Sequence, residues 1–379
     1  MQLVTASGAD VWRLLPGAMA GRFVLAPLPD DPEAAARTVA MLRLDEPVLE
    51  PGAAVIVASS GSTGEPKGVV LAAAALRASA VATHERLGGP GNWTCALPVH
   101  HVAGLMTLVR SLIADQQPRF CAPDLADLAP VSGVASPLSR SGPGADRDYI
   151  SLVGTQLARA LGNPEATAKL AGFDAVLVGG GPVPSELLGR AQEAGVRVVT
   201  SYGMSETCGG CVYDGTALRG VGVRIEAGRV VLSGPMLFAG YRLRPDLTAQ
   251  ALLDGELFTA DRGELVAGRL RVLGRLDDVV ISGGVNVDLA AVQRRLDALG
   301  GGAVAVFGVP DAEWGTRVVA LTEGDWDASA LRAALVGHFE PAALPKEVRR
   351  VRVLPRTATG KIDRRALAAS WREVDRWRA

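Results

Sequence analysis

The sequence is poor in aromatic residues, in cysteine and in long apolar runs. Aromatic side chains make up 4% of the 379 residues, and only four residues are cysteines. Four cysteines in a chain of this length do not form the disulfide framework of a small secreted protein, and they suit a reducing compartment. No run approaches the roughly 18 apolar residues that span a membrane, and the N-terminus has no basic segment followed by an apolar core. We therefore expect a soluble cytoplasmic protein.

An excess of charge of one sign is also missing. The 39 basic residues balance 40 acidic ones, which gives a formal net charge of -1. Nothing in this balance favours nucleic acid or an anionic membrane surface as a partner, so an anionic ligand must be met by a local cluster. The chain is too long for one ordinary core and predicts two domains, or a large domain with a smaller one. The sequence does not fix the oligomeric state, and a homodimer is one candidate.

What the sequence does contain is apolar runs that alternate with glycine turns and helices. Residues 174–207, DAVLVGGGPVPSELLGRAQEAGVRVVTSYGMSET, predict a strand, a glycine turn, a helix over about 184–194, a second strand and a polar loop. The crossover of such a βαβ unit is right-handed, and ligands collect where loops leave the carboxyl ends of the strands. We expect an α/β fold of mostly parallel sheets with flanking helices, in which the GGGP turn and the SYGMSET loop lie side by side.

The texture of the chain changes after GRLDDVVISGG (274–284), where short helices and strands lead to the basic tail PRTATGKIDRRAL. We place a domain boundary near Asp277, with an N-terminal domain over 1–276 and a small α+β domain over 277–379. A stretch rich in Pro, Gly and Ser, 129–148, predicts a long surface connection.

One loop stands out by its composition. Residues 59–69, SSGSTGEPKGV, follow the apolar run 55–58 and combine three glycines, four hydroxyls and Lys67. Glycines let the backbone approach a ligand, while amides, hydroxyls and a lysine attract phosphate oxygens. The loop is no Walker A motif, because Gly68 and Val69 follow the lysine. A phosphate cradle and a flexible surface turn both remain open from this loop alone.

The loop is the first of a series of motifs. In order along the chain these read SSGSTGEPKGV (59–69), LPVHHVAGL (97–105), VGGGPVP (178–184), SYGMSET (201–207), FTADRGEL (258–265), GRLDDVVISGG (274–284) and PRTATGKIDR (355–364). The series resembles the signature motifs of the adenylate-forming superfamily, which contains acyl-CoA synthetases, peptide-synthetase adenylation domains and luciferases. The resemblance extends from about residue 50 to the C-terminus. It implies a large N-terminal domain and a small mobile C-terminal domain, with ATP, Mg²⁺ and CoA as cofactor and co-substrates.

The resemblance also implies the residues of the nucleotide site. The phosphates would be held by Gly61, Ser62, Thr63, Gly64 and Lys67. Glu206 resembles the superfamily's Mg²⁺ ligand, and Ser205 stands where a threonine contacts the α-phosphate. The adenine slot would be formed by Tyr202 and Gly203 on one side and by Gly180, Gly181 and Pro182 on the other. Asp261, with Arg275, would bind the ribose, although Ala260 departs from the usual T-G-D.

Further residues would serve the acyl and thiol steps. Lys361, in TGK, resembles the mobile catalytic lysine that bridges carboxylate and α-phosphate. Asp277 corresponds to the hinge, and Gly283 and Gly284 to a narrow path for the CoA thiol. His101 aligns with a residue that lies beside the carboxylate of the acid and gates this path. The alternative is a histidine that only packs in the fold, and this alternative is favoured for His100.

Three segments of the chain show a closer resemblance, which indicates the acyl substrate. GGPGNWTCALPVHHVAGLMTLVRSL, YISLVGTQLARAL and TSYGMSETCGGCVYDG are similar to segments of the o-succinylbenzoate:CoA ligases of menaquinone biosynthesis, especially a compact actinobacterial form. Thr155 and Gln156 are therefore candidate pocket residues, unless they merely begin a helix. The segment SGGVNVDLAAVQ departs from the commoner G-G-E-N-I-x-P-x-E-I-E, which bears on how the small domain docks on CoA.

Other functions remain as alternatives. Another aryl- or acyl-CoA ligase of the superfamily would carry the same motifs. A dinucleotide oxidoreductase is disfavoured because VGGGPVP lacks the G-x-G-x-x-G spacing. A non-catalytic acyl-sensing or scaffold protein is conceivable, since folds outlive activities. A redox or zinc site at Cys208 and Cys211 lacks a second pair at suitable spacing, and two small residues behind the adenine loop are the simpler interpretation.

Overall fold

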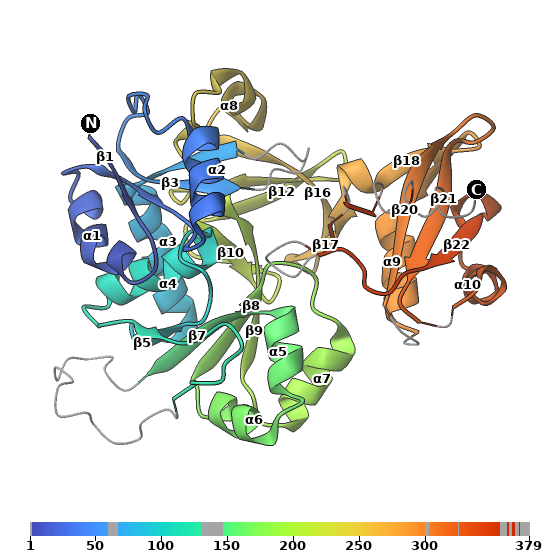
Figure 1. Cartoon of the computed structure of the whole chain (residues 1–379), viewed down its shortest axis with the longest axis horizontal. Coiled ribbons are helices and arrows are strands. Elements are labelled where there is room, and N and C mark those ends of the chain that lie inside the picture. Colours follow the sequence, from blue (N-terminus) through green and yellow to red (C-terminus); the bar gives the residue numbers. More distant parts are fainter. Residues whose placement is uncertain are drawn as a thin grey trace. The chain divides into compact units, whose positions relative to one another are not determined.

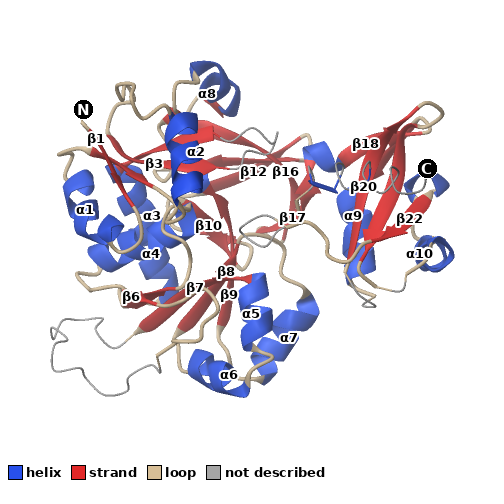
Figure 2. Cartoon of the chain, viewed as in Figure 1, coloured by secondary structure: helices blue, strands red, loops and turns tan. Residues whose placement is uncertain are grey.

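The computed structural model describes residues 2–59, 67–129, 147–299, 303–324 and 326–356, together with 362–363, 366–367 and 371. The chain forms two compact units. Unit 1 comprises Met1–Arg224, Val231–Thr259 and Leu265–Leu270, and unit 2 comprises Ile225–Val230, Ala260–Glu264 and Arg271–Ala379. Helices and strands are mixed throughout both units (Figures 1 and 2), which confirms the predicted α/β class. Within the described residues no helix is long and apolar enough to cross a membrane.

The first sheet of unit 1 has the order β1-β2-β3-β4-β14. Its strands are β1 (Leu3–Ala6), β2 (Val24–Pro27), β3 (Ala53–Ser59), β4 (Lys67–Ala72) and β14 (Gly240–Tyr241). The apolar run before the glycine-rich loop forms β3, which is buried over its first five residues. Strands β3 and β4 form an antiparallel hairpin in which Ser59 pairs with Lys67. Strand β14 pairs with β4 and brings Tyr241 opposite Val69.

The second sheet has the order β11-β10-β9-β8-β7-β5-β6. Its strands are β5 (Asn92–Cys95), β6 (Arg119–Phe120), β7 (Asp148–Val153), β8 (Ala175–Gly179), β9 (Val198–Met204), β10 (Gly209–Tyr213) and β11 (Thr216–Ala217). Strands β5 to β9 pair in parallel. The predicted βαβ unit is confirmed as β8, α7 (Ser185–Glu193) and β9.

Helices cover both faces of this sheet. They are α3 (Ala73–Leu87), α4 (Val102–Ile113), α5 (Gly154–Ala160) and α6 (Pro164–Ala171), besides α7, while α1 (Asp10–Met19), α2 (Pro32–Leu42) and α8 (Pro245–Ala251) complete unit 1. Alternate strand residues face the two layers, as the pleat requires. Ile150 and Val176 pack against α5, α6 and α7, whereas Tyr149 and Leu177 pack on the face of α3. Figure 1 shows the two helical layers on opposite sides of β7 and β8.

A third sheet has the order β12-β13-β16-β15, with β17 paired to β16. Its strands are β12 (Gly222–Glu226), β13 (Arg229–Ser233), β15 (Leu252–Leu253), β16 (Glu256–Val266) and β17 (Arg269–Arg275).

The fourth sheet belongs to unit 2 and has the order β19-β18-β21-β20, with β22 on β21. Its strands are β18 (Val279–Ser282), β19 (Val285–Asp288), β20 (Val304–Asp311), β21 (Gly315–Thr322) and β22 (Glu347–Arg350). Helices α9 (Leu289–Asp297) and α10 (Ala328–Leu335) bury one face. Leu354, Leu367 and Trp371 cover the other face. Unit 2 thus has a core of its own, as a small α+β domain requires.

The domain boundary and hinge at Asp277 and the surface connection over 129–148 stay predictions. From Arg271 to the C-terminus every residue belongs to unit 2, so this segment begins shortly before the predicted boundary at Asp277. A hinge implies movement about Asp277, which one structure does not test. The surface connection predicted over 129–148 lies largely outside the described residues.

Candidate active site

Lys67, Glu206 and Tyr241 meet in unit 1, although they come from three separate elements. The Tyr241 hydroxyl donates a 2.8 Å hydrogen bond to Oε1 of Glu206. Nζ of Lys67 lies 4.3 Å from the centre of the Tyr241 ring, a distance at which a cation is attracted to the ring face. Burial, followed by the charge of Glu206, raises the pKa of Tyr241. The phenol therefore keeps its proton and donates it.

The backbone explains why these residues converge. Lys67 begins β4, and Glu206 lies in a short 3-10 turn, η1 (Ser205–Thr207), directly after β9. The amide of Phe238 donates to the carbonyl of Glu206 (2.9 Å), and the amide of Arg242 donates to the carbonyl of Gly68 (2.8 Å). The segment 238–242 therefore ties the turn to β4. Gly68 is needed at this crossing, since a Cβ there would lie 2.7 Å from the side chains of Arg242 and Leu42.

Arg242 holds the next part of the chain. Its side chain is 2% exposed and lies 3.8 Å from Glu50. Its guanidinium donates to four backbone carbonyls, those of Leu42, Arg43, Glu46 and Pro47. A buried arginine paired in this way fixes the end of α2 against β14.

The SYGMSET loop is locked by internal contacts. The Thr207 hydroxyl accepts from the amide of Met204 (2.9 Å) and donates to the carbonyl of Gly209 (2.6 Å). A Cβ on Gly203 would lie 2.1 Å from the same carbonyl, so only glycine fits there. The turn thereby presents Ser205 and Glu206 in one fixed conformation.

The adenine-slot residues follow neighbouring strands. Gly180 comes directly after β8 with φ +86°, and Tyr202 lies near the end of β9. Because β8 and β9 pair in parallel, the GGGP turn and the SYGMSET loop leave the same edge of the sheet, as predicted. Gly180, Gly181 and Pro182 are exposed there. Their contact with adenine stays a prediction.

His101 lies at the start of α4, next to His100. Their ring centroids are 4.3 Å apart. Burial, with a smaller effect of His100, lowers the pKa of His101 to about 4. His101 is therefore neutral near pH 7 and would contact a substrate by shape and hydrogen bonding, not by charge. Its role as a gate stays a prediction.

Gln156 has a structural task that its motif did not reveal. Its Nε2 donates to the carbonyls of Ala96 (2.9 Å) and Pro123 (2.8 Å), and its Oε1 accepts from the amide of Val153 (3.0 Å). The side chain is buried, whereas Thr155 is exposed. Gln156 joins the start of α5 to two other loops, and a contact of either residue with substrate stays a prediction.

Arg110 was missed by sequence reasoning. It lies in the apolar helix α4 and is 2% exposed. Its guanidinium lies 4.8 Å from the centre of the Trp93 ring, and Nη2 donates to the Tyr213 hydroxyl (3.4 Å). No carboxylate of the described residues pairs with it, and its Nε has no hydrogen-bond partner among them. An arginine in an apolar helix was the available signal, because such a cation is rarely fully buried without an anion.

The position of Arg110 links it to the SYGMSET loop. A Cβ built on Gly209 would lie 3.9 Å from Nη2 of Arg110 and 3.3 Å from Met106. Burial lowers the pKa of Arg110, and the Tyr213 phenol opposes this effect. The guanidinium remains charged because its ordinary pKa is above 12. It is therefore a buried positive charge that approaches Gly209, which follows Glu206 by three residues along the chain.

Comparison with known proteins decides the family. Residues 23–242 match the family of AMP-binding enzymes, and residues 302–361 match the C-terminal domain of AMP-binding enzymes. The chain belongs to the AMP-binding enzyme family. A probable 2-succinylbenzoate–CoA ligase of Mycobacterium tuberculosis is 45% identical over 340 residues, which is 86% of this chain and 86% of that protein.

Solved structures of AMP-binding enzymes have the same fold. One is an o-succinylbenzoate CoA synthetase from Bacillus subtilis in complex with ATP and magnesium, with a TM-score of 0.70 and 27% identity over 84% of this chain and 70% of that one. A structure of such a synthetase from the same organism holds the acyl-adenylate intermediate, with a TM-score of 0.72 and 26% identity over 94% of this chain and 80% of that one. The large N-terminal and small C-terminal parts of the family confirm the predicted architecture.

The donor set at Glu206 fits the family's use of Mg²⁺. The described residues contain no group of three or more His, Cys, Asp or Glu that could enclose a metal. Mg²⁺ is commonly bound by one or two carboxylates together with water and substrate phosphates. Glu206 has the ligand chemistry of such a partial site, and its binding of Mg²⁺ together with Ser205 stays a prediction.

In unit 2 the predicted ribose residues form an ion pair. Nη1 of Arg275 lies 3.4 Å from Oδ1 of Asp261, and its Nε donates to Asp277 (2.7 Å). Ala260 is half-buried beside Asp261 in β16, and the Asp261 carboxylate pairs with Arg275 despite the departure from T-G-D. Binding of ribose by this pair stays a prediction.

Gly283 and Gly284 form the tight turn between β18 and β19 of unit 2. Both have positive φ angles, +56° and +80°. A Cβ on Gly283 would lie 2.9 Å from the Trp314 ring, whereas one on Gly284 would meet nothing within 4 Å. Open space beside Gly284 is compatible with the predicted thiol path.

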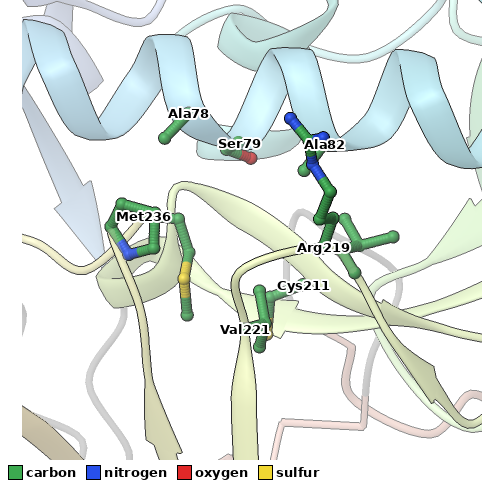
Figure 3. Close-up of a pocket in the computed structure, with 10 residues that line it drawn as sticks. Ala78, Ser79, Ala82, Cys211, Arg219, Val221 and Met236 are labelled. Atoms are coloured by element: carbon green, nitrogen blue, oxygen red, sulfur yellow. The ribbon is translucent and has the colours of Figure 1, made fainter.

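Cys208 and Cys211 are buried and have no disulfide. Burial raises the pKa of Cys211 to about 12 and also raises that of Cys208. Both thiols are therefore protonated and unsuited to redox chemistry. Cys211 borders a recess between α3 and β10 that measures only about 10 Å³ (Figure 3), enough for about one water molecule. The simpler interpretation, small residues behind the adenine loop, agrees with their burial.

A larger hollow of about 500 Å³ lies against the amino end of β9, between Leu188 and Asp214. It contains none of the predicted site residues. Five predicted residues lie outside the described part of the chain: Gly61, Ser62, Thr63, Gly64 and Lys361.

Proposed function

We propose that the chain is an AMP-forming acid:CoA ligase whose acid is o-succinylbenzoate. The acid and ATP would form o-succinylbenzoyl-AMP and pyrophosphate, and the thiol of CoA would then displace AMP to give o-succinylbenzoyl-CoA. The names of the mycobacterial relative and of the Bacillus structures support the acid. Family membership supports the reaction class.

The described site suits the first step. When a carboxylate attacks the α-phosphate, negative charge must be neutralised on the phosphates and on the departing pyrophosphate. Lys67 supplies a positive charge near Glu206. Mg²⁺, when bound, would neutralise phosphate charge in the same place. Ser205 would donate its hydroxyl to a phosphate oxygen, and Lys361 would bridge the carboxylate and the α-phosphate.

The choice of this acid rests on the buried guanidinium of Arg110, which would pair with the carboxylate that does not react. o-Succinylbenzoate has two carboxylates, of which only one reacts, so the other needs a fixed cation. Arg110 is a desolvated cation without a carboxylate partner among the described residues, next to Gly209 behind the SYGMSET loop. A monocarboxylic acid would leave this charge buried and unpaired, which is unfavourable.

The test is a panel of acids assayed by ATP–pyrophosphate exchange and by thioester formation. o-Succinylbenzoate should exceed benzoates and medium-chain acids in kcat/KM. Arg110→Met should lower kcat/KM for o-succinylbenzoate about 100-fold, since truncating one partner of a buried charge pair costs about 2–5 kcal/mol. The exposed Arg77 of α3 gives the control Arg77→Met, which should change nothing. A benzoate or medium-chain acid preferred about tenfold would refute the acid but not the reaction class.

We also propose a cytoplasmic homodimer that acts on small molecules alone. The balanced charge supports the absence of nucleic acid and membrane partners. Light scattering coupled to size-exclusion chromatography tests the dimer, and cell fractionation tests the location.

A further inference from the structure

Tyr241 contacts two residues of the proposed nucleotide site, yet it belongs to none of the motifs recognised in the sequence. Its hydroxyl binds Glu206 and its ring lies beneath Lys67. We propose that Tyr241 is a positioning residue for Mg·ATP, whose hydroxyl fixes the carboxylate of Glu206 for the metal. This inference rests on the proposed use of ATP and Mg²⁺ and does not depend on the identity of the acid.

The two oxygens of Glu206 are unequal. Oε1 accepts the hydrogen bond of Tyr241, whereas no described residue donates to Oε2. A hydrogen bond to one oxygen restricts the rotation of the carboxylate and leaves the other oxygen for a cation. Hydrogen bonds from a second layer of residues are a general means of orienting metal-binding carboxylates, and their removal typically costs about 10–100-fold in metal affinity or activity.

Tyr241 is itself held firmly. Its amide donates to the Thr248 hydroxyl (2.8 Å), and its ring lies edge-on to Phe238 with the centroids 4.9 Å apart. The following residue, Arg242, is anchored by its hydrogen bonds to the four backbone carbonyls described above. A side chain fixed through its own backbone can set the orientation of its partner, as a preorganised site requires.

A purely structural role for Tyr241 makes a different prediction. If the hydroxyl only contributes to folding, its removal lowers the free energy of unfolding but leaves Mg²⁺ binding unchanged. If it positions Glu206, removal shifts the Mg²⁺ dependence of ATP binding. The Phe variant keeps the ring beneath Lys67, so ATP binding without metal serves as an internal reference.

The experiment measures ATP binding by calorimetry and by the ATP-induced shift of the thermal midpoint, at graded Mg²⁺ and without acid or CoA. For Tyr241→Phe we expect the half-saturating Mg²⁺ concentration to rise about 10-fold, with Mg²⁺-free ATP affinity within about twofold of the parent. Tyr213→Phe is the matched control. Tyr213 is fully buried and its hydroxyl lies 2.9 Å from Thr83, so this variant should lose stability and keep the parent's Mg²⁺ curve.

A double variant decides whether the effect passes through Glu206. Glu206→Gln removes the charge that Tyr241 orients, so adding Tyr241→Phe to it should shift the Mg²⁺ curve by less than about twofold further. A full additional shift would overturn the proposal, as would an unchanged Mg²⁺ curve in the single Phe variant. If the parent itself binds ATP without any response to Mg²⁺, the proposed function fails instead, and the two failures are distinguishable.

Discussion

The indole nitrogen of Trp93 donates a 3.2 Å hydrogen bond to Nε2 of His84. A ring nitrogen can accept this bond only while it carries no proton. His84 is buried in α3, and burial, followed by the charge of Arg110, lowers the pKa of His84 to about 4. The same indole ring faces the guanidinium of Arg110. A neutral histidine thus forms part of the surroundings of the buried arginine.

This relationship predicts how stability depends on pH. In the unfolded chain His84 has a pKa of about 6.5, so between about pH 6.5 and about pH 4 the unfolded state binds more protons than the folded state. The contribution of neutral His84 is complete above this window and is lost as the pH falls through it. We expect the free energy of unfolding in urea to be about 2 kcal/mol lower at about pH 5 than at about pH 7.5 from His84 alone.

Two variants isolate this effect, because His101 has a similarly low pKa of about 4 and acts in the same direction. His84→Gln should lose less stability on acidification than the parent. His338→Gln, at an exposed histidine of unit 2, should lose as much as the parent. Equal losses in all three proteins would contradict the prediction.

Arg242 provides a stability prediction. Arg242→Met should lower the free energy of unfolding by about 3 kcal/mol or more, because four carbonyls lose their donor and Glu50 loses its partner. Arg244→Met is the control, since Arg244 is 46% exposed and pairs with Asp246 at the surface. It should cost less than about 1 kcal/mol. Similar urea midpoints for both variants would argue against the anchor.

Sequence reasoning succeeded where the signal is local. The strand, helix and strand of residues 174–207 follow from apolar periodicity and a glycine turn, and parallel strands place Gly180 and Tyr202 at one edge of the sheet. Lys67 and Glu206 were named from motifs, and the structure places both beside Tyr241.

The contacts of Tyr241 and Gln156 could not be predicted from the sequence, because they join distant parts of the chain. Tyr241 meets Glu206 only because the two-residue strand β14 pairs with β4, and so short a strand has no periodicity to detect. Gln156 appears in sequence as an ordinary helix start, whereas its partners are the backbones of Ala96 and Pro123. Arg110, by contrast, was readable as a charge within an apolar helix.

Gln156 and Thr155 give opposite expectations for a pocket role. Gln156→Leu should lower the free energy of unfolding by about 2 kcal/mol or more, since three backbone groups lose their partner. If the residue is only structural, KM for the acid at permissive temperature should change little. Thr155→Val, at an exposed position, should leave stability unchanged, and a raised KM there would place Thr155 at the substrate. A stable Gln156→Leu enzyme with a greatly raised KM would reverse the assignment.

Gly284 tests the predicted thiol path. Gly284→Leu should keep ATP–pyrophosphate exchange and lose thioester formation, because a side chain would occupy the space now open beside the turn. The positive φ of +80° adds backbone strain, so the control must share it. Gly255 has φ +78° and is equally open. Gly255→Leu should carry the same strain and still form thioester, and failure of both variants would refute a specific path at Gly284.

Lys361, which lies outside the described residues, separates the two half-reactions. Superfamily resemblance predicts that the C-terminal domain turns about Asp277 after the adenylate forms, and that Lys361 leaves the cleft in this step. Lys361→Ala should lower the rate of adenylation by at least about 100-fold, the usual cost of removing a group that stabilises transition-state charge. The same variant, supplied with preformed acyl-adenylate, should form thioester at the parent's rate.

A second lysine provides the comparison for this experiment. Lys169 lies in α6 and pairs with Glu165 at 2.7 Å near the surface, so Lys169→Ala removes the same charge without touching the predicted site. It should leave both half-reactions unchanged. The Gly284→Leu enzyme should show the reverse of Lys361→Ala, because it loses only the step that Lys361→Ala retains. If both variants damage both half-reactions equally, the domain does not alternate between two orientations, and a single cleft geometry must serve adenylation and thiol transfer alike.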